Sequence, residues 1–342
     1  MNLYEKARII EGIASLTDST KFLNLYSLLK SYIRPYVIIL VYHRIGTFND
    51  DWAVQPTELK DFEIQMKYLK ETYNIISLEE MANLINTKKS IPKKAVVITF
   101  DDGYKDNYTN AFPILKKYRI PSTIFLTTGH IDTNIPFWWD ILGYVLYNSK
   151  QKKLNAGDLG DISIYPKNNL TKSFYDFIEK LKKMPENKKH IIIDKIIENS
   201  DVEIPENFGR DLITSWDEVK EMNENGIEFG AHTVNHPILT RISLQQVKNE
   251  IMQSKKDIEK RINKPITTFC YPNGLPQDFN EDIKNLIKDN GFICASTIIP
   301  KPITTKTDLF ELGRIPPGLS PYSFKFCLSG LYSDIYKLNP LK

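Results

Sequence analysis

The segment Ala95-Val-Val-Ile-Thr-Phe-Asp-Asp-Gly-Tyr104 places two adjacent carboxylates directly after six apolar or β-branched residues. An apolar run of this length is typical of a parallel strand that is buried on both faces. The carboxyl ends of such strands carry the catalytic residues of α/β barrels and open sheets. Consecutive strand side chains point in opposite directions, so Asp101 and Asp102 need not share a role. One can bind a metal ion while the other acts as a base; the alternative is an ordinary Asp-Gly turn in which Asp101 caps the next helix.

Outward from this segment, short apolar runs alternate with stretches of helical spacing. Val37–Tyr42 is a second unbroken β-branched and aromatic run, and it ends directly before His43. Repeated βα units without an antiparallel hairpin signal predict an α/β fold with a parallel sheet or barrel. Further strands are expected at 122–126, 227–231, 266–271 and 292–298, and helices at 57–69, 77–84, 107–118, 215–225, 243–262 and 281–290.

Residues 132–215 interrupt this alternation. They begin with the aromatic run Ile-Pro-Phe-Trp-Trp-Asp at 135–140 and continue through lysine- and asparagine-rich sequence without a clear strand. Because a structureless loop of about 80 residues is improbable in a compact domain, we expect an inserted helical lid or subdomain. Its aromatic residues suit packing on the barrel, stacking on a sugar ring or contact with a membrane interface, and Trp138 is the candidate substrate residue.

The rest of the chain divides into three expected parts. Residues 1–36 carry apolar residues at helical spacing up to a proline and are expected to form an N-terminal helical extension. Residues 37–131 and 216–320 are expected to form the barrel, and residues 321–342 a C-terminal tail helix.

The composition excludes several classes of protein. The 342 residues are 42% hydrophobic and 25% charged, which rules out a disordered or collagen-like chain. A net charge of +3 leaves no basic footprint for nucleic acid. Three cysteines without a paired spacing suggest neither a disulfide framework nor a zinc finger, so we expect a reduced, cytoplasmic setting. We expect no signal peptide and no membrane-spanning helix, which limits membrane contact to a peripheral one.

Two of the five histidines, His232 and His236, lie four residues apart at the end of the strand expected over 227–231. Pro237 disfavours helical geometry at His236, so we expect a turn there. Two imidazoles at this spacing can bind one metal ion if the backbone turns between them, and an ordinary core or surface pair is the alternative. Combined with the Asp-Asp pair, they supply the two histidines and one carboxylate of an open zinc-type site.

The two motifs together resemble those of the NodB-homology polysaccharide deacetylases, carbohydrate esterase family four. The first family motif matches Thr-Phe-Asp-Asp-Gly at 99–103, and the second matches His-Thr-x-x-His at 232–236. The resemblance covers residues 37–131 and 216–318 and implies a distorted (β/α) barrel of about seven strands. It also implies a metal-dependent hydrolase that removes N-acetyl groups from amino sugars of a polysaccharide or glycan precursor.

The resemblance also implies roles for individual residues. Asp102, His232 and His236 would hold a divalent metal ion, Zn²⁺ foremost, with Co²⁺ or Ni²⁺ as alternatives. Asp101 would be the general base that deprotonates the metal-bound water. The backbone N–H of Tyr104 would face the developing oxyanion.

The third family motif departs from its usual form. The matching segment, Phe-Cys-Tyr-Pro-Asn-Gly at 269–274, lacks the usual arginine and resembles a permuted Phe-x-Tyr-Pro-x-Gly branch that includes deacetylases of bacterial surface and biofilm polysaccharides. Tyr271 and Asn273 are therefore candidate substrate residues. Arg314 is the candidate replacement for the missing arginine, with an ordinary structural arginine as the alternative.

The C-terminal histidine that supplies the family's general acid is also missing, because no histidine follows His236. The permuted branch instead carries a histidine after an early strand, which is the position of His43. We expect His43 to protonate the departing amine; the alternative is a histidine that only orders the region around Asp101.

The expected partner is an N-acetylated glycan or a lipid-linked sugar, and the sequence does not define the oligomeric state. Two other functions stay open. One is a deformylase or other small-amide hydrolase on the same barrel, and the other is a catalytically silent carbohydrate-binding relative. The retained Asp and His residues argue against the silent relative, whereas the missing third-motif arginine keeps it open.

Overall fold

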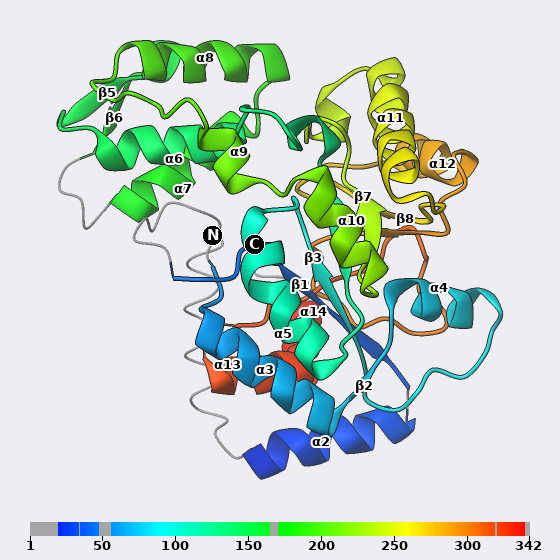
Figure 1. Cartoon of the computed structure of the whole chain (residues 1–342). Helices are drawn as coiled ribbons and strands as arrows, with labels where there is room; N and C mark the ends of the chain where they lie inside the picture. The colour runs from blue at the N-terminus through cyan, green and yellow to red at the C-terminus, as the bar shows by residue number, and fades with distance from the viewer. Residues whose placement is uncertain (1–19, 34, 48–55, 165–169, 319, 339–342) are drawn as a thin grey trace.

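Seven strands, all paired in parallel, form the main sheet (Figure 1). The computed structural model describes residues 20–33, 35–47, 56–164, 170–318 and 320–338. The strand order is β1-β3-β4-β7-β8-β9, and β2 pairs with β3. The predicted α/β fold with about seven strands is confirmed. The strands are β1 Val37–Tyr42, β2 Asn74–Ile75, β3 Ala95–Phe100, β4 Thr123–Leu126, β7 Glu228–Ala231, β8 Thr268–Cys270 and β9 Cys294–Ser296.

The pairing of β1 with β3 is the longest ladder of the sheet. It runs over six residues, and both strands are buried along their whole length. β8 and β9 pair over three residues only, so they are shorter than predicted. β9 ends at Ser296 because the next N–H, that of Thr297, donates to the carbonyl of Leu312 instead.

Residues 312–315 close the curled sheet between β9 and β1. Leu312 bridges Ser296 of β9, and Ile315 bridges Leu40 of β1, both in parallel. The N–H of Ile315 donates to the carbonyl of Ile39 at 2.8 Å. This short segment therefore takes the place of a strand in the barrel wall, and it carries Arg314.

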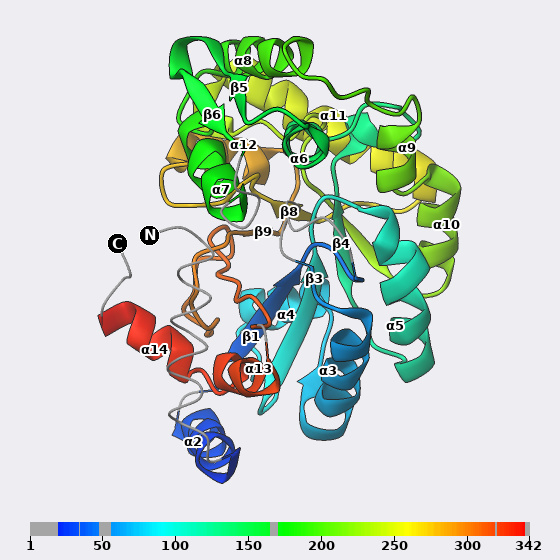
Figure 2. The same ribbon diagram turned by 90° about the vertical axis from the view of Figure 1, so that its left-hand side faces the viewer.

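Helices surround the curled sheet (Figure 2). α11 begins with a complete capping box at Ser243, as its sequence indicates, and buries Val247, Ile251 and Ile258 at intervals of a helical turn. No helix in the described part of the chain is long and apolar enough to cross a membrane. The helices of the barrel region are α3 Leu59–Thr72, α4 Leu78–Asn86, α5 Phe112–Tyr118, α10 Trp216–Glu224, α11 Leu244–Ile262 and α12 Glu281–Asp289.

The helix expected over 107–118 begins with a π-helical turn, Asn107–Ala111, before α5. Pro113 has no N–H to donate, so the regular α-helical ladder cannot run through it. The N–H of Phe112 donates to the carbonyl of Asn107 instead, which widens the turn. This turn directs the amide of Asn107 to the carbonyl of His43 at 2.7 Å, so it also positions the end of β1.

The region expected as a lid has an apolar core of its own, which includes Leu142, Leu154, Ile162 and Ile193. It contains an antiparallel hairpin, β5 Lys153–Asn155 with β6 Asp161–Ser163, which the sequence analysis did not predict. Each of these strands has three residues with one buried side chain, too short for a strand period to be recognised. Its helices are α6 Trp138–Asn148, α7 Leu170–Leu181, α8 Glu186–Glu198 and α9 Phe208–Leu212.

The two ends of the described chain pack against each other. α2, Thr20–Ile33, lies within the expected N-terminal extension and contacts α13. The single tail helix expected at the C-terminus is instead two helices, α13 Pro321–Leu328 and α14 Leu331–Leu338, because Gly330 between them has a left-handed φ of 78°. Residues 1–19 and 339–342 of these two expectations lie outside the described residues.

Gly230 in β7 provides a test of the close packing between neighbouring strands of the main sheet. A Cβ at this position would lie 2.5 Å from the ring of Phe125 and 2.6 Å from Oγ1 of Thr268. We expect Gly230→Ala to lower the free energy of unfolding by about 2–3 kcal/mol, measured by chemical denaturation. Gly226→Ala is the control, because no atom lies within 4 Å of its added Cβ and only its φ of 91° opposes the change. A loss no larger than the roughly 1 kcal/mol expected for Gly226→Ala would contradict close packing at β7.

Candidate metal centre

The predicted site residues meet at the carboxyl ends of three strands of the main sheet, β1, β3 and β7, with β4 between the last two. His43 follows β1, Asp101 and Asp102 follow β3, and His232 follows β7. Because parallel strands end at the same edge of a sheet, residues far apart in the sequence are brought together. The backbone ladders continue into the site, where the N–H of Asp101 donates to the carbonyl of Tyr42 at 3.0 Å.

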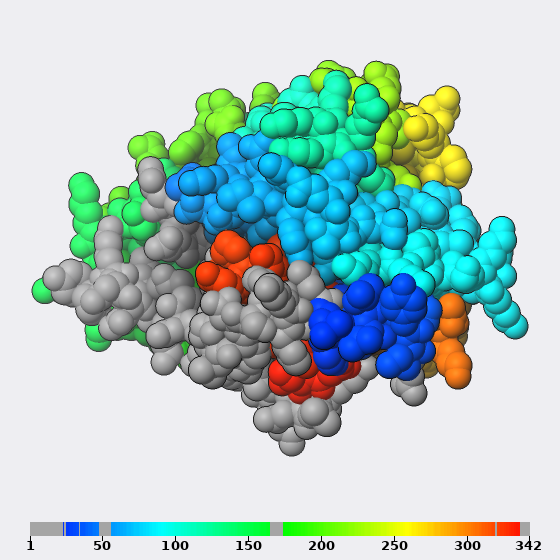
Figure 3. Space-filling view, turned by 90° about the horizontal axis from the view of Figure 1, so that it is seen from below, coloured from blue at the N-terminus to red at the C-terminus, as the bar shows by residue number. Residues whose placement is uncertain are grey.

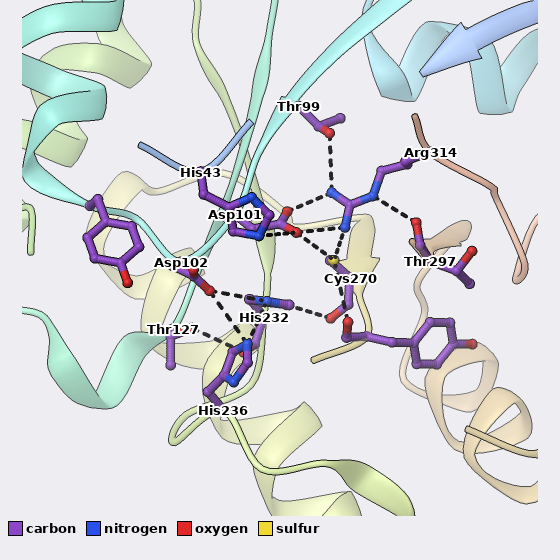
Figure 4. Close-up of polar contacts among 12 residues, drawn as sticks. His43, Thr99, Asp101, Asp102, Thr127, His232, His236, Cys270, Thr297 and Arg314 are labelled. Carbon is purple, nitrogen blue, oxygen red and sulfur yellow. Dashed lines mark hydrogen bonds and ion pairs between the residues drawn. The ribbon is translucent and has the colours of Figure 1, made fainter. Parts of the chain in front are cut away.

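Asp102, His232 and His236 form a triangle of donor atoms. Figure 4 shows the three side chains pointing toward one another. The two histidine Nε2 atoms are 3.1 Å apart, and each lies 3.5 Å from Oδ1 of Asp102. Ligands of a tetrahedral zinc ion at about 2.0–2.1 Å are separated by about 3.3 Å. The spacing and the chemistry of these three donors therefore fit a zinc-type ion.

The backbone between the two histidines forms a turn, as predicted, and not a helix. Thr233 and His236 have left-handed φ values of 68° and 55°. Oγ1 of Thr233 accepts the N–H of His236 at 3.0 Å, and Glu250 of α11 accepts the N–H groups of Val234 and Asn235. These bonds satisfy the turn's N–H groups and hold a conformation that non-glycine residues seldom adopt.

The carbonyl of Cys270 orients His232. It lies 2.8 Å from Nδ1 of the ring, and since a carbonyl only accepts, Nδ1 must carry the proton. The lone pair is then on Nε2, the atom that faces Asp102 and His236. Burial lowers the pKa of both histidines, so both rings are neutral, which is the form that binds metals.

Arg314 and Asp101 form a bidentate ion pair, in which Nη1 and Nη2 each lie 2.6 Å from a carboxylate oxygen. The same guanidinium donates to the carbonyl of Thr297 at 3.0 Å and to Oγ1 of Thr99 at 3.2 Å. Both partners of the ion pair are buried. Burial alone would raise the pKa of Asp101, but the charge and hydrogen bonds of Arg314 outweigh it and hold this pKa well below its usual range.

The neighbouring Asp102 has the opposite environment. Burial and the charges of Asp101 and Asp140 raise its pKa well above the usual range. The two adjacent carboxylates therefore differ electrostatically. The guanidinium of Arg314 stabilises the charge of Asp101, whereas Asp102 faces two neutral histidines. A divalent cation at the donor triangle would supply the missing positive charge.

A second group of metal-ligand types, Asp101, His232 and Cys270, lies nearby. Nη2 of Arg314 is 3.0 Å from Sγ of Cys270 and already occupies the side of Asp101 that faces it. A metal ion there would meet a fixed positive charge, so this second group does not form a competing site.

His43 lies on the remaining side of Asp101, with Nε2 3.8 Å from Oδ2. Its side chain is 28% exposed, whereas that of Asp101 is 4% exposed, so the imidazole is the group of this pair that a ligand reaches. Burial lowers the pKa of His43 to about 4, and the charge of Asp101 only partly opposes this.

The lid reaches the centre through the start of α6. Nε1 of Trp139 donates to the phenol oxygen of Tyr104 at 2.8 Å, and that phenol donates to Asp140 at 3.1 Å. The ring of Trp139 is stacked on Phe137 and lies 4.8 Å from the ring of His236. The sequence analysis included Trp139 among the aromatic residues of this run but named Trp138 as the substrate residue, and it missed Asp140, the one acid inside the run.

Trp138 does not share this position. Nζ of Lys189 lies 4.7 Å from its ring, which places Trp138 between α6 and α8 of the lid. Tyr271 and Asn273 also have partners within the fold: the phenol of Tyr271 donates to the carbonyl of Phe310 at 3.0 Å, and the amide of Asn273 donates to Asp278. Of the predicted residues, the structure brings together His43, Asp101, Asp102, Tyr104, His232, His236 and Arg314.

Comparison with known families identifies the class. The model of the family described as polysaccharide deacetylase matches residues 88–295, which is more than half of the chain and includes both motifs. The chain belongs to the polysaccharide deacetylase family. It is accordingly a hydrolase of the class that acts on N-acetyl amides.

Individual relatives agree with this class. YxkH of Bacillus subtilis, which is named for the same family, is 25% identical over 289 residues that cover 84% of this chain and 74% of that protein. The poly-beta-1,6-N-acetyl-D-glucosamine N-deacetylase of Staphylococcus aureus is 25% identical over 264 residues, and the match covers 74% of this chain and 65% of the enzyme.

Solved structures share the fold. The deacetylase PplD of Streptococcus pyogenes, in complex with acetate, aligns with a TM-score of 0.58 and 21% identity over 86% of this chain and 99% of that one. IcaB from Ammonifex degensii aligns with a TM-score of 0.55 and 16% identity over 86% of this chain and 97% of that one.

The Arg314–Asp101 pair predicts a specific pattern of stability. We expect Arg314→Met to lower the free energy of unfolding by about 3–5 kcal/mol, because it leaves the buried Asp101 carboxylate without its counter-charge. The double variant Asp101→Asn/Arg314→Met should recover part of this loss, since no charge is then left unpaired. Chemical denaturation of the two single variants and the double variant measures the coupling. Additive losses would contradict a direct ion pair.

Proposed function

We propose that the protein is a metal-dependent hydrolase that removes N-acetyl groups from amino sugars of a polysaccharide or glycan precursor. The observation that carries this proposal is the donor triangle of Asp102, His232 and His236 directly beside the arginine-tethered Asp101. In this proposal the triangle holds Zn²⁺, with Co²⁺ or Ni²⁺ as alternatives. When bound, such an ion polarises the amide carbonyl and lowers the pKa of water from about 15.7 toward 7.

Asp101 is proposed as the general base. Arg314 keeps its carboxylate ionised and fixed, and an ionised carboxylate can accept the proton of the attacking water. The same tether holds Asp101 away from the triangle, so the two adjacent aspartates have separate roles. Arg314 thereby does the work of the arginine missing from the third motif, which supports placing the chain in the Phe-x-Tyr-Pro-x-Gly branch.

His43 is proposed to protonate the departing amine. With a pKa of about 4, its imidazole is neutral at pH 7, so it must gain a proton during the reaction. The nearby Asp101, 3.8 Å from Nε2, holds the proton taken from water and can pass it on. One proton thus moves from the water to the amine nitrogen while the C–N bond breaks, and both residues return to their starting states.

The backbone N–H of Tyr104 is proposed to stabilise the oxyanion. Within the described chain, the hydrogen bonds of Tyr104 involve its phenol and its carbonyl, which accepts the N–H of Asn107, and its own N–H has no acceptor. The bonds of the phenol to Asp140 and Trp139 fix the residue, so the N–H is preorganised. We further propose that residues 132–215 act as a lid over the site and that Trp139, rather than Trp138, borders the bound sugar.

The substrate class follows from the family together with the named activity of one relative. Because the S. aureus relative is named as acting on poly-beta-1,6-N-acetyl-D-glucosamine, we propose a glycan that contains N-acetylglucosamine as the first substrate to test.

Metal removal tests the proposal directly. We expect acetate release from N-acetylglucosamine oligomers to stop when the protein is stripped with a chelator and to return when Zn²⁺ is restored. Asp102→Asn should lose both bound zinc, measured by elemental analysis, and activity. Asp101→Asn should keep the zinc and lose at least about 10²-fold in kcat, the usual range for general-base catalysis. Activity that is independent of metal, or that survives Asp101→Asn, would exclude this mechanism.

His43→Ala separates the proposed acid from a metal ligand. We expect zinc content to stay unchanged and kcat on a sugar amide to fall by about 10²–10⁴-fold. An acetylated nitroaniline should lose much less, because its amine departs without strong need of a proton. A fall in zinc content would make His43 a ligand, and equal losses on both substrates would assign it an ordering role.

A further inference from the structure

Helix α2 presents apolar side chains to solvent. Leu25, Leu28, Leu29, Tyr32 and Ile33 recur at helical spacing, and each is between 39% and 78% exposed. We refer to these five residues as the α2 stripe. A surface helix normally turns such a stripe toward the core, and an exposed apolar patch marks an interaction site.

Polar contacts hold α2 in this orientation. On its inner face, Oγ of Ser27 lies 3.3 Å from the phenol oxygen of Tyr36, and Nζ of Lys30 donates to the carbonyl of Gly330 at 3.1 Å. Lys30 and Tyr26 both bind the carboxylate of Asp334 in α14. Rotating the helix to bury the stripe would break all of these bonds. The bonds therefore hold the stripe on the surface.

A lysine-rich loop borders the stripe. Residues 87–94, which follow α4, contain four lysines and no acidic residue. Nζ of Lys93 lies 3.6 Å from the centre of the Tyr32 ring, which joins this loop to the end of the stripe. Figure 3 shows the blue atoms of α2 at the surface beside cyan atoms of the α4 region. We refer to residues 87–94 as the lysine loop.

We propose that the α2 stripe and the lysine loop together bind the surface of an anionic lipid bilayer. An apolar helix face bordered by cations suits the boundary between lipid chains and anionic headgroups. A second copy of the chain fits less well, because a symmetric contact would place two lysine loops at the rim of one interface without acids in either loop.

This surface is separate from the metal centre. α2 directly precedes β1, whereas His43 directly follows it, so six strand residues lie between the two ends. At about 3.3 Å per residue, β1 alone separates them by roughly 20 Å. Substitutions in the stripe therefore leave the proposed catalytic residues untouched, and acetate release from a soluble oligomer reports on the proposed function independently.

The proposal is tested by flotation of the 342-residue chain with vesicles of neutral phosphatidylcholine, and with vesicles that also contain phosphatidylglycerol. We expect binding to the anionic vesicles and at least tenfold weaker binding to the neutral ones. Leu25→Gln/Leu29→Gln/Ile33→Gln should weaken anionic binding at least tenfold. Lys89→Gln/Lys93→Gln should weaken it roughly 25-fold at low salt, the product of about fivefold for each lysine.

Matched controls change equally exposed residues elsewhere. Leu244→Gln/Ile191→Gln alters two apolar side chains that are 52% and 53% exposed, and Lys152→Gln/Lys153→Gln removes two exposed charges; both should bind like the unaltered protein. Circular dichroism establishes that each variant is folded. Failure of the unaltered protein to bind anionic vesicles overturns the proposal, as does unchanged binding of the stripe variant. A dimer that the stripe substitutions dissociate, without vesicle binding, assigns this face to a second copy.

Discussion

The ion pair between Arg314 and Asp101 is the constraint on which the site depends. The segment that carries Arg314 also closes the curled sheet between β9 and β1, so the barrel cannot close without delivering this guanidinium to its interior. A buried ion pair adds little net stability over apolar residues of similar size, because both charges must leave water. Its value lies instead in fixing one ionised carboxylate at the mouth of the barrel.

This constraint distinguishes two adjacent and chemically identical residues. Asp101 has the Arg314 cation on one side, which lowers its pKa. Asp102 faces two neutral imidazoles, and its pKa is raised. The left-handed backbone of Asp102, with a φ of 73°, turns its side chain out of the strand and toward the histidines. Environment and backbone therefore assign separate chemistry to the pair, and the lid adds Trp139 against His236 on the opposite side.

Local patterns made much of the fold and the donor triangle predictable. Strand ends are visible where apolar runs meet Asp101 or His232, and both motifs are short. The Arg314–Asp101 contact joins residues 213 positions apart, so no local pattern reveals it, and the family resemblance alone suggested it. Periodicity recognised α2 as a helix but not the side its stripe faces, which polar contacts to Asp334 decide. Neighbouring Trp138 and Trp139 differ by about 100° around α6, and the sequence alone does not show which one meets the site.

The direction of the parallel strands places two surfaces at opposite ends of the barrel. Every strand of the main sheet runs from the end near α2 to the end that carries the metal centre. If the α2 stripe lies on a bilayer, the mouth of the site faces away from the bilayer. The distance between the mouth and the stripe is at least the length of β1, roughly 20 Å. A sugar held at the headgroups would not reach that mouth, whereas a glycan chain that extends from the surface would. The geometry of attachment therefore favours a polymer over a short lipid-linked sugar.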